Sequence, residues 1–402
     1  MGVTSADLAT WVQAAMTKEG IRNYKLDVSG NSVKGDGYLG EVTFVEVTPD
    51  LGSKRIHLVV KSAKTSDEFR QQTPVKEAYE RETFMYTRVF PVFEEFQKEF
   101  AAEARFDKLA RCYGACSENK KEALIMENLK VAGFEIHDRY APQNLNHALY
   151  VFQNYGKLHA VSLAMKLKEP VLFEKLTRNM TDVMGKFLLQ SKLVPSLTKC
   201  FESAVEVLQR NGREDLAGKY RKVKDGLEEC LTGYVNPEMA ESVILHGDCW
   251  NNNMMFKYEG GNKTQPVDMR FIDFQLSRVA SPVFDLSYYL YTCTDKSVLA
   301  NFHFLLQAYH SSLSEAMKKL RCDCDKLFSF EQKYGRYGLA LAPWIVKIEL
   351  CRSDEVVDFA ESAERGEGMD KMFDFELQDQ AVYESRMADV LGHFAEEFLS
   401  TE

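Results

Sequence analysis

Two short polar runs, each preceded by apolar residues, constrain the fold of this chain most. Residues 244–253 read Ile-Leu-His-Gly-Asp-Cys-Trp-Asn-Asn-Asn, and residues 271–275 read Phe-Ile-Asp-Phe-Gln. Between them, two apolar segments flank a stretch rich in Gly, Asn, Thr and Pro, which predicts a β-hairpin. In an antiparallel pair, the residue that enters the first strand lies beside the residue that leaves the second. We therefore expect Asn253 and Asp273 to meet at one end of the hairpin.

Asp248, Asn253 and Asp273 are residue types that phosphoryl transfer requires. The reaction needs a carboxylate that orients the attacking hydroxyl and oxygen ligands that hold Mg²⁺ against nucleotide phosphates. Asp248 and Asn253 have the spacing of the H-R-D-x-x-x-x-N loop of protein kinases, where the Asp is the base and the Asn binds metal. We predict Asp248 as the catalytic base, and Asn253 and Asp273 as ligands of Mg²⁺ that accompanies ATP. The alternative, two ordinary polar turns, does not explain why order, spacing and hairpin agree.

Glycines and a lysine near the N-terminus predict the phosphate contacts of the nucleotide. Gly35, Gly37 and Gly40 precede a predicted strand over Glu41–Val47, and a second strand, Arg55–Lys61, follows a turn. Glycines between strands allow backbone N–H groups to approach phosphates, although many such loops are plain hairpin turns. The lysine that ends the second strand strengthens the first interpretation.

Lys61 needs a carboxylate to orient it. The segment Val75–Val89 is predicted to be helical, with an apolar face formed by Ala78, Met85, Tyr86 and Val89. Glu82 lies on that same face, and a carboxylate turned inward must find a partner or lose its hydration uncompensated. We expect Lys61 to be that partner, as in the kinase Lys–Glu pair that holds nucleotide phosphates. Glu77 and Glu80 on other faces are the alternatives, as is a surface salt bridge of little consequence.

The chain is long enough for two lobes. Its 402 residues, 45% hydrophobic and 27% charged, can bury substantial cores. Glu122–Met126 is a predicted strand, after which Glu127–Leu129 would form a hinge whose backbone contacts adenine. We predict an α+β, protein-kinase-like fold. A small antiparallel-sheet lobe that binds nucleotide would span residues 1–129, and a large, mainly helical lobe that carries the catalytic and substrate-binding residues would span 130–402.

Two polar residues in predicted helices are interpreted as structural. His159 lies near the apolar face of a long helix and is expected to be a core histidine with satisfied hydrogen bonds. Asp285 opens another helix after Ser281-Pro282, where it can accept hydrogen bonds from backbone donors.

Composition narrows the location and the partners. The formal net charge of −10, without a basic run, argues against nucleic acid. Nine cysteines, an odd number in a chain too large to need disulfides, favour a reducing compartment, and Cys322-Asp323-Cys324 is expected to be a surface loop rather than a zinc site. Residues 339–346 fall short of the ~20 apolar residues of a membrane span, and the N-terminus shows neither a secretory signal nor a complete myristoylation motif. We expect a cytoplasmic protein without a membrane, nucleic-acid or obligate protein partner.

Several motifs together resemble the ecdysteroid kinase-like proteins of the choline and aminoglycoside kinase superfamily. They are His246–Asn253, Asp273–Gln275, Ser281–Pro282 with Asp285–Leu286, Glu127–Leu129 and Leu158–Ala160. The His-Gly-Asp-x-Trp-x-x-Asn form, and the Gln after Asp-Phe where protein kinases have Gly, are fairly specific to this branch. The resemblance implies a kinase-like fold, ATP and Mg²⁺, the same base and metal ligands, and transfer to a hydroxyl of an ecdysteroid, plant or xenobiotic alcohol. The loop Gly35–Gly40 resembles a protein-kinase glycine loop as much as the family's own.

The resemblance also places the acceptor pocket in the C-terminal lobe, on helices that carry Tyr288, Tyr289 and Trp344. Their aromatic and apolar surroundings suit a flat polycyclic alcohol, and the alternative is that they form lobe core. We predict a steroid or similar small-molecule alcohol as the acceptor.

Two other functions compete with this prediction. A choline or ethanolamine kinase would need carboxylates around the ammonium group, and Glu349, Asp354 and Glu355 follow Trp344 closely. Lys347 and Arg352 would compete for those carboxylates, which favours a neutral acceptor. A catalytically silent pseudokinase that acts as a binding protein is the third candidate, and the intact base and metal positions argue against it.

Overall fold

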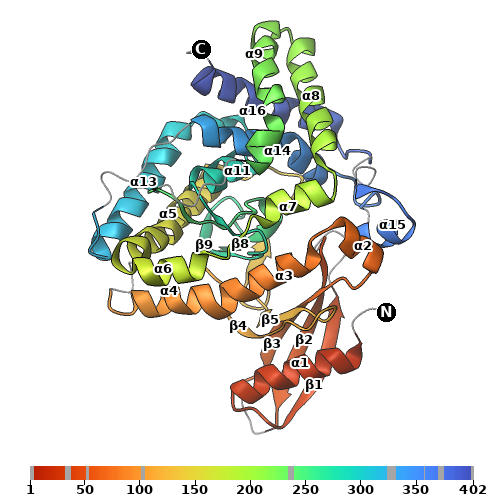
Figure 1. Cartoon of the computed structure of the whole chain (residues 1–402), viewed down its shortest axis with the longest axis vertical. Helices are drawn as coiled ribbons and strands as arrows, with labels where there is room; N and C mark the ends of the chain where they lie inside the picture. The colour runs from red at the N-terminus through yellow and green to blue at the C-terminus, as the bar shows by residue number, and fades with distance from the viewer. Residues whose placement is uncertain are drawn as a thin grey trace.

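An antiparallel sheet occupies the N-terminal part of the chain and helices dominate the C-terminal part (Figure 1). The structure, a computed structural model, describes residues 4–31, 38–50, 54–100, 105–233, 240–323, 332–356, 358–369 and 375–399. The predicted α+β class, with a small sheet region before a large helical one, is confirmed. The boundary between residues 129 and 130 stays a prediction, and Gly35 and Gly37 lie outside the described residues.

The N-terminal sheet has five strands in the order β1-β2-β3-β5-β4, and each neighbouring pair is antiparallel. Their bounds are Tyr24–Asn31 (β1), Gly40–Pro49 (β2), Ile56–Ala63 (β3), Cys112–Cys116 (β4) and Ala123–Glu127 (β5). The three predicted strands are β2, β3 and β5, with ends shifted by one or two residues. Strands β1 and β4 escaped prediction because they form the edges of the sheet, and β1 is largely exposed and carries little apolar pattern.

Helix α1, Ser5–Lys18, covers one face of this sheet. Thr4 caps it: the Thr4 hydroxyl accepts a hydrogen bond from the Asp7 amide at 3.1 Å, and the Asp7 carboxylate accepts one from the Thr4 amide. The apolar side of α1 packs against Leu58 and Val60 of β3, among other strand residues. Since side chains alternate along a strand, Lys61 points to the opposite face.

That opposite face meets a second group of helices. They are α2 (Asp67–Gln72), α3 (Val75–Phe84), a π-helical turn (Met85–Val89) and α4 (Phe90–Gln97). The helix predicted over residues 75–89 is confirmed, and it continues through the π turn to Gln97. Glu82 is only 3% exposed, so the inward orientation predicted for it is present.

The predicted hairpin is also present. Strands β6 (Phe134–Ile136), β8 (Met254–Tyr258) and β9 (Pro266–Phe271) form a small antiparallel sheet, in which Met254 pairs with Phe271. A second, two-stranded sheet pairs β7 (Val243–Ile244) with β10 (Val279–Ala280). In sequence, β7 precedes the β8–β9 hairpin and β10 follows it. The residues just outside β8 and β9, Asn253 and Ile272, are joined by a backbone hydrogen bond of 3.0 Å.

Helices supply most of the remaining structure, and α5 packs on α13 as α11 packs on α14. Their bounds are α5 Leu145–Lys168, α6 Pro170–Thr177, α7 Val183–Gln190, α8 Val194–Arg210, α9 Glu214–Asp225, α10 Leu227–Thr232, α11 Val283–Cys293, α12 Lys296–Leu299, α13 Phe302–Lys319, α14 Gln332–Glu349, α15 Phe359–Glu364 and α16 Gln380–Phe398. In the part of the chain that the structure describes, no helix has the length and apolarity needed to cross a bilayer.

Candidate active site

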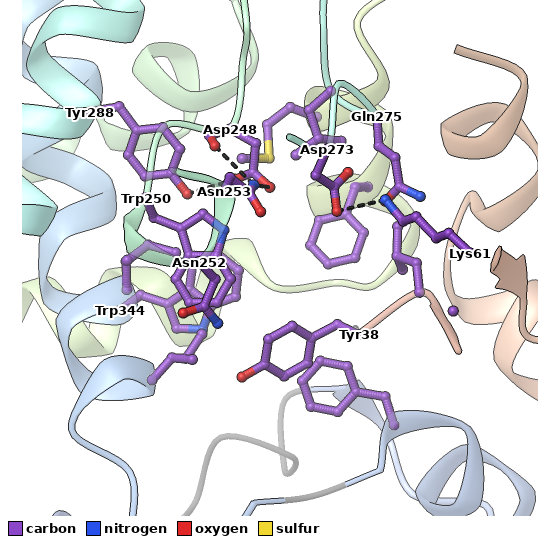
Figure 2. A pocket seen from close by; sticks show the side chains of 18 residues that line it. Tyr38, Lys61, Asp248, Trp250, Asn252, Asn253, Asp273, Gln275, Tyr288 and Trp344 are labelled. Carbon is purple, nitrogen blue, oxygen red and sulfur yellow. Dashed lines mark hydrogen bonds and ion pairs between the residues drawn. The ribbon is translucent and has the colours of Figure 1, made fainter. Parts of the chain in front are cut away.

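Two adjoining cavities share the polar residues Lys61, Asn252, Asn253 and Asp273. The sheet-side cavity, of about 840 Å³, is further lined by Val42, Phe44, Val59, Glu82, Tyr86, Ala110, Met126, Glu127, Asn128, Leu129, Lys130, Ile136, Met255 and Ile272. The helix-side cavity, of about 880 Å³, is further lined by Tyr38, Leu39, Gly40, Met184, Phe187, Asp248, Trp250, Gln275, Leu276, Tyr288, Trp344, Ile345, Ile348 and Phe359 (Figure 2). The two cavities therefore meet at the polar residues predicted for catalysis.

The loop that carries Asp248 is held by a buried carboxylate. The amides of His246 and Gly247 donate to the two oxygens of Asp285 at 2.8 and 2.9 Å, and the His159 ring lies 3.2 Å from one of them. Burial alone would raise the pKa of Asp285, but the hydrogen bond and charge of His159 hold it below its usual range. The second ring nitrogen of His159 contacts the Tyr309 hydroxyl at 3.0 Å. The structural roles predicted for Asp285 and His159 are confirmed.

Gly247 has a conformation and a packing position that only glycine fits. Its φ is +89°, and a Cβ added there would lie 2.2 Å from the Leu276 carbonyl oxygen. The residue between His246 and Asp248 thus allows the catalytic loop to pass directly against the segment that follows Asp273.

Both oxygens of the Asp248 carboxylate accept hydrogen bonds. Oδ1 accepts from the Tyr288 hydroxyl at 3.0 Å and Oδ2 from the Asn253 side-chain amide at 2.8 Å. Burial, and then the negative charge of Asp273, raise the pKa of Asp248 to about 7, although these two hydrogen bonds oppose the rise. A carboxylate oriented in this way, with its pKa near neutrality, suits a general base.

Lys61 lies between two carboxylates. Its ammonium is 2.8 Å from Glu82 Oε2 and 2.8 Å from Asp273 Oδ2, the latter contact drawn in Figure 2, so the predicted Lys61–Glu82 pair is present. Burial alone would lower the pKa of Lys61, but Asp273 and Glu82 outweigh it and raise the pKa. Burial, with the charge of Asp273, raises the pKa of Glu82 to about 7, because one ammonium cannot fully compensate two carboxylates.

Asp273 and Gln275 complete the polar end of the cavities. Asp273 has a φ of 65°, a left-handed conformation that is uncommon outside glycine and that gathers at functional sites. With its amide oriented to satisfy both neighbours, Gln275 donates to Asp273 Oδ1 and accepts from Lys61 Nζ, each at 3.2 Å. Sequence reasoning used Gln275 only as a family marker, whereas here it joins the two charged groups.

Asn253 and Asp273 fit a magnesium site. The predicted meeting of the two is confirmed, since both line both cavities. The Asn253 side-chain nitrogen donates to Asp248, which leaves the amide oxygen free of that contact. Mg²⁺ is usually bound by one or two protein carboxylate or amide oxygens together with substrate phosphates, and this donor set matches that requirement.

The other predicted nucleotide contacts have different positions. Glu127 and Leu129 line the sheet-side cavity, beside Met126 at the end of β5. Gly40 lies in β2 and lines the helix-side cavity, and a Cβ there would be 1.8 Å from the Tyr79 hydroxyl and 2.5 Å from the Ser62 carbonyl oxygen. Close packing around β2 therefore requires a glycine at this position, independently of any contact between its backbone and phosphates.

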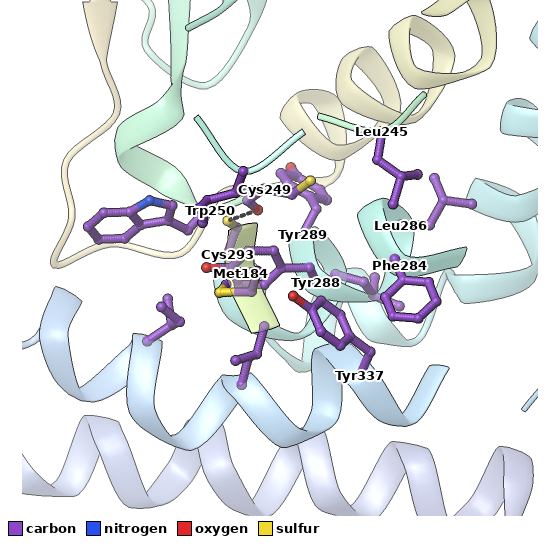
Figure 3. Packing of buried hydrophobic residues seen from close by; sticks show 14 of the residues in the cluster. Met184, Leu245, Cys249, Trp250, Phe284, Leu286, Tyr288, Tyr289, Cys293 and Tyr337 are labelled. Atoms are coloured by element: carbon purple, nitrogen blue, oxygen red, sulfur yellow. Dashed lines mark hydrogen bonds between the residues drawn. The ribbon is translucent and has the colours of Figure 1, made fainter. Parts of the chain in front are cut away.

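Of the predicted acceptor residues, Trp344 and Tyr288 line the helix-side cavity and Tyr289 does not. Tyr289 is fully buried in the packed core shown in Figure 3, and its hydroxyl donates to Gln143 Oε1 at 2.8 Å. Successive helical residues point about 100° apart, and of the two neighbouring tyrosines of α11 it is Tyr288 that lines the cavity. Sequence reasoning missed Tyr38, Phe187 and Phe359, which belong to the same lining.

Two of the three carboxylates named for a choline site have other partners. Glu349 is buried and lies 3.2 Å from Arg386, and Asp354 lies 2.7 Å from Arg352. Arg352 thus takes Asp354 as expected, while Glu349 pairs with a residue of α16 that the sequence did not suggest. Among the described residues, the carboxylates that line the helix-side cavity are those of Asp248 and Asp273. Cys324 lies outside the described residues, so the surface loop at Cys322–Cys324 stays a prediction.

The antiparallel sheet, the Lys61–Glu82 pair and the loop that carries Asp248 together define a phosphotransferase of the kinase-like class. More particularly, the chain belongs to the ecdysteroid kinase-like family, whose sequence model matches residues 34–322.

Comparison with solved structures gives distant matches. The GDP complex of wild-type aminoglycoside 2'-phosphotransferase-IIIa is 12% identical over 98% of this chain and 100% of that one, with a TM-score of 0.40. A glucosamine kinase in complex with glucosamine, ADP and inorganic phosphate is 13% identical over 94% of this chain and 97% of that one, with a TM-score of 0.38. No curated protein sequence matches the chain.

Proposed function

We propose that this small-molecule kinase uses ATP and Mg²⁺ to phosphorylate a hydroxyl of an ecdysteroid or a similar steroid or xenobiotic alcohol. One observation carries the proposal. Lys61, Asn253 and Asp273 line both cavities, whereas Asp248 lines the helix-side cavity alone. This arrangement supports a nucleotide on the sheet side, an acceptor on the helix side, and a base on the acceptor's side of the junction.

The nucleotide would lie with its adenine against the apolar part of the sheet-side cavity. Val42, Val59 and Met126 supply that part, next to the backbone of Glu127–Leu129. The phosphates would then extend towards Lys61, which Glu82 orients through the 2.8 Å ion pair. Asp273 and Asn253 would hold Mg²⁺, which when bound neutralises charge on the transferred phosphoryl group.

The acceptor hydroxyl would donate its hydrogen to an oxygen of Asp248. As the hydroxyl oxygen bonds to the γ-phosphorus and the bond to the β-phosphate oxygen breaks, the proton passes to Asp248 and ADP leaves. Tyr288 and Asn253 hold the carboxylate from two sides at 3.0 and 2.8 Å. This fixed geometry lowers the entropic cost of bringing hydroxyl and base together.

The lining of the helix-side cavity supports a neutral, largely apolar acceptor. Away from the polar end, its wall is aromatic and aliphatic, with Trp250 and Trp344 on one side (Figure 2). Such surfaces bind flat polycyclic molecules well. We further propose a cytoplasmic location, which the free thiols of the described cysteines support. We also propose that the protein has no obligate protein partner.

A competition assay with purified protein, ATP and Mg²⁺ tests the proposal. A polyhydroxylated sterol should be phosphorylated with a kcat/KM at least roughly tenfold above that of choline, a gap of about 1.4 kcal/mol in transition-state binding. A preference for choline would replace the steroid acceptor by an amino alcohol. Nucleotide binding without transfer to any alcohol would indicate a silent binding protein.

A further inference from the structure

A segment from late in the sequence packs against the N-terminal sheet region as well as against the helical part that surrounds it in sequence. Helix α15 lies beside α2, although almost 300 residues separate them in the chain (Figure 1). The side-chain amide of Gln72, the last residue of α2, donates to the carbonyl oxygen of Glu367 at 3.2 Å. The segment 358–369 thus bridges the two parts of the molecule.

An ion pair anchors the start of this segment. Lys64 Nζ contacts Asp358 Oδ1, and the two side chains are only 9% and 21% exposed, so water screens the pair less than a surface pair. Asp358 also caps α15, because Oδ1 accepts from the Ala360 amide at 2.9 Å. Lys64 follows β3, the strand that carries Lys61, and its amide donates to Leu39 at 3.2 Å. The anchor therefore connects α15 with the strand that would hold the nucleotide phosphates.

The residue after the anchor forms part of the helix-side cavity. Phe359 stacks on Tyr38 with ring centroids 4.8 Å apart and an angle of 28° between the planes, and the Tyr38 centroid is 6.0 Å from that of Trp250. All three rings line the cavity, and Tyr38 faces the polar end across it (Figure 2). This wall of the cavity is thus built from the N-terminal region, the catalytic loop and the segment 358–369.

We propose that Phe359 determines acceptor specificity, and that the Lys64–Asp358 pair is a positioning contact that fixes Phe359 against Tyr38. The pair of stacked rings limits how far an acceptor can extend from the hydroxyl held at Asp248. This inference rests on the proposed function, because it takes the helix-side cavity as the acceptor site.

Part of this wall lies outside the family match. The match ends at residue 322, and Trp344, Asp358 and Phe359 follow it. The catalytic residues lie inside the matched region, as do Tyr38 and Trp250.

Replacement of Phe359 tests the wall directly. Phe359→Ala should raise the KM for a polyhydroxylated sterol at least ~tenfold, because an aromatic contact of this size is lost, while the KM for ATP stays within about twofold. The kcat/KM for a two- or three-carbon alcohol should change little, so selectivity for the sterol falls. Phe359→Trp should also raise the KM for the sterol, because the larger side chain narrows the cavity. Phe304→Ala, the same kind of change at a residue that is 49% exposed, is the control.

The anchor is tested by a double-mutant cycle. Asp358→Asn keeps a helix-capping side chain and Lys64→Met keeps the length of the stem, so each removes charge with little loss of packing. Each should raise the sterol KM several-fold without changing the KM for ATP. The sterol KM of the double variant should be no higher than that of the more impaired single variant. Additive effects, or equal losses for ATP and sterol, would overturn the positioning role.

Sterol binding, followed by the fluorescence of the tryptophans in the cavity, separates failure of this inference from failure of the proposed function. Suppose that the wild type binds the sterol but phosphorylates no alcohol, and that Phe359→Ala weakens sterol binding about tenfold. The proposed activity is then wrong, whereas the inference about Phe359 is supported. If the wild type phosphorylates the sterol and Phe359→Ala leaves both KM and binding unchanged, the inference fails alone. If the wild type does not bind the sterol at all, both are wrong.

Discussion

The two cavities of this protein are built in different ways. The sheet-side cavity is assembled from secondary-structure elements whose patterns can be recognised, a strand that ends near Lys61, a helix face that carries Glu82, and a hairpin that joins Asn253 to Asp273. The helix-side cavity is assembled from single residues of distant segments, such as Tyr38, Trp250 and Phe359.

This difference separates chemistry from selectivity. The residues that would hold phosphate and metal lie within short motifs, where spacing in the sequence nearly determines spacing in the structure. The residues that would select the acceptor are brought together only by packing. Variants on the two sides should therefore have separable effects, with the largest where the cavities meet.

The largest effect is expected at the shared metal position. Asp273→Ala removes the carboxylate that would bind Mg²⁺, so turnover should fall below detection and Mg·ATP binding should weaken far more than binding of metal-free ATP. Calorimetry with and without Mg²⁺ makes this comparison. Equal Mg²⁺ dependence in the wild type and Asp273→Ala would contradict the assignment.

The next largest effect is expected at the base. Asp248→Asn keeps the shape of the side chain but removes the proton acceptor, so kcat should fall by about 10²–10⁴-fold while ATP affinity is retained. Steady-state assays give kcat, and nucleotide titrations of the same preparation give the affinity for ATP. Near-normal turnover of Asp248→Asn would remove Asp248 from the base role.

A matched pair of tyrosine variants tests the different positions of Tyr288 and Tyr289 on α11. Tyr288→Phe removes the 3.0 Å hydrogen bond to Asp248 and should lower kcat by roughly tenfold, about 1.4 kcal/mol, with little change in the KM for ATP. Tyr289→Phe removes a hydroxyl that contacts Gln143 in the core and should affect stability more than kcat. Equal kinetic losses for the two variants would place both tyrosines in the same role.

The sequence predicted the fold class and the polar half of the site because both depend on local periodicity. Asn253 and Asp273 follow from hairpin geometry, and Glu82 from its position on a helical face. It could not separate Tyr288 from Tyr289, since that choice depends on how α11 is rotated against its neighbours. It also could not identify the Phe359–Tyr38 stack or the Glu349–Arg386 pair, because each joins segments whose contact depends on the whole fold.

The smallest expected effect is on the pH dependence of stability, and it comes from two histidines outside both cavities. Burial lowers the pKa of His147 and of His393 to about 4. Since these folded-state pKa values lie below the ordinary value near 6.5, the stability that neutral histidines contribute is present above about pH 6.5 and is lost as the pH falls towards 4. The melting temperature should therefore drop on acidification from pH 7 to 5, and less so in His147→Gln or His393→Gln. An unchanged acid dependence in both variants would show that other groups control it.

The division of labour between the cavities can be tested by binding alone. Lys61→Met changes the nucleotide phosphate contact and Trp344→Ala changes the wall of the helix-side cavity, so titration of each variant with Mg·ATP and with a polyhydroxylated sterol compares the two sides directly. We predict that Lys61→Met loses ATP affinity and keeps sterol affinity, and that Trp344→Ala does the reverse. Loss of ATP affinity in Trp344→Ala with sterol binding unchanged would contradict the assignment of the two cavities.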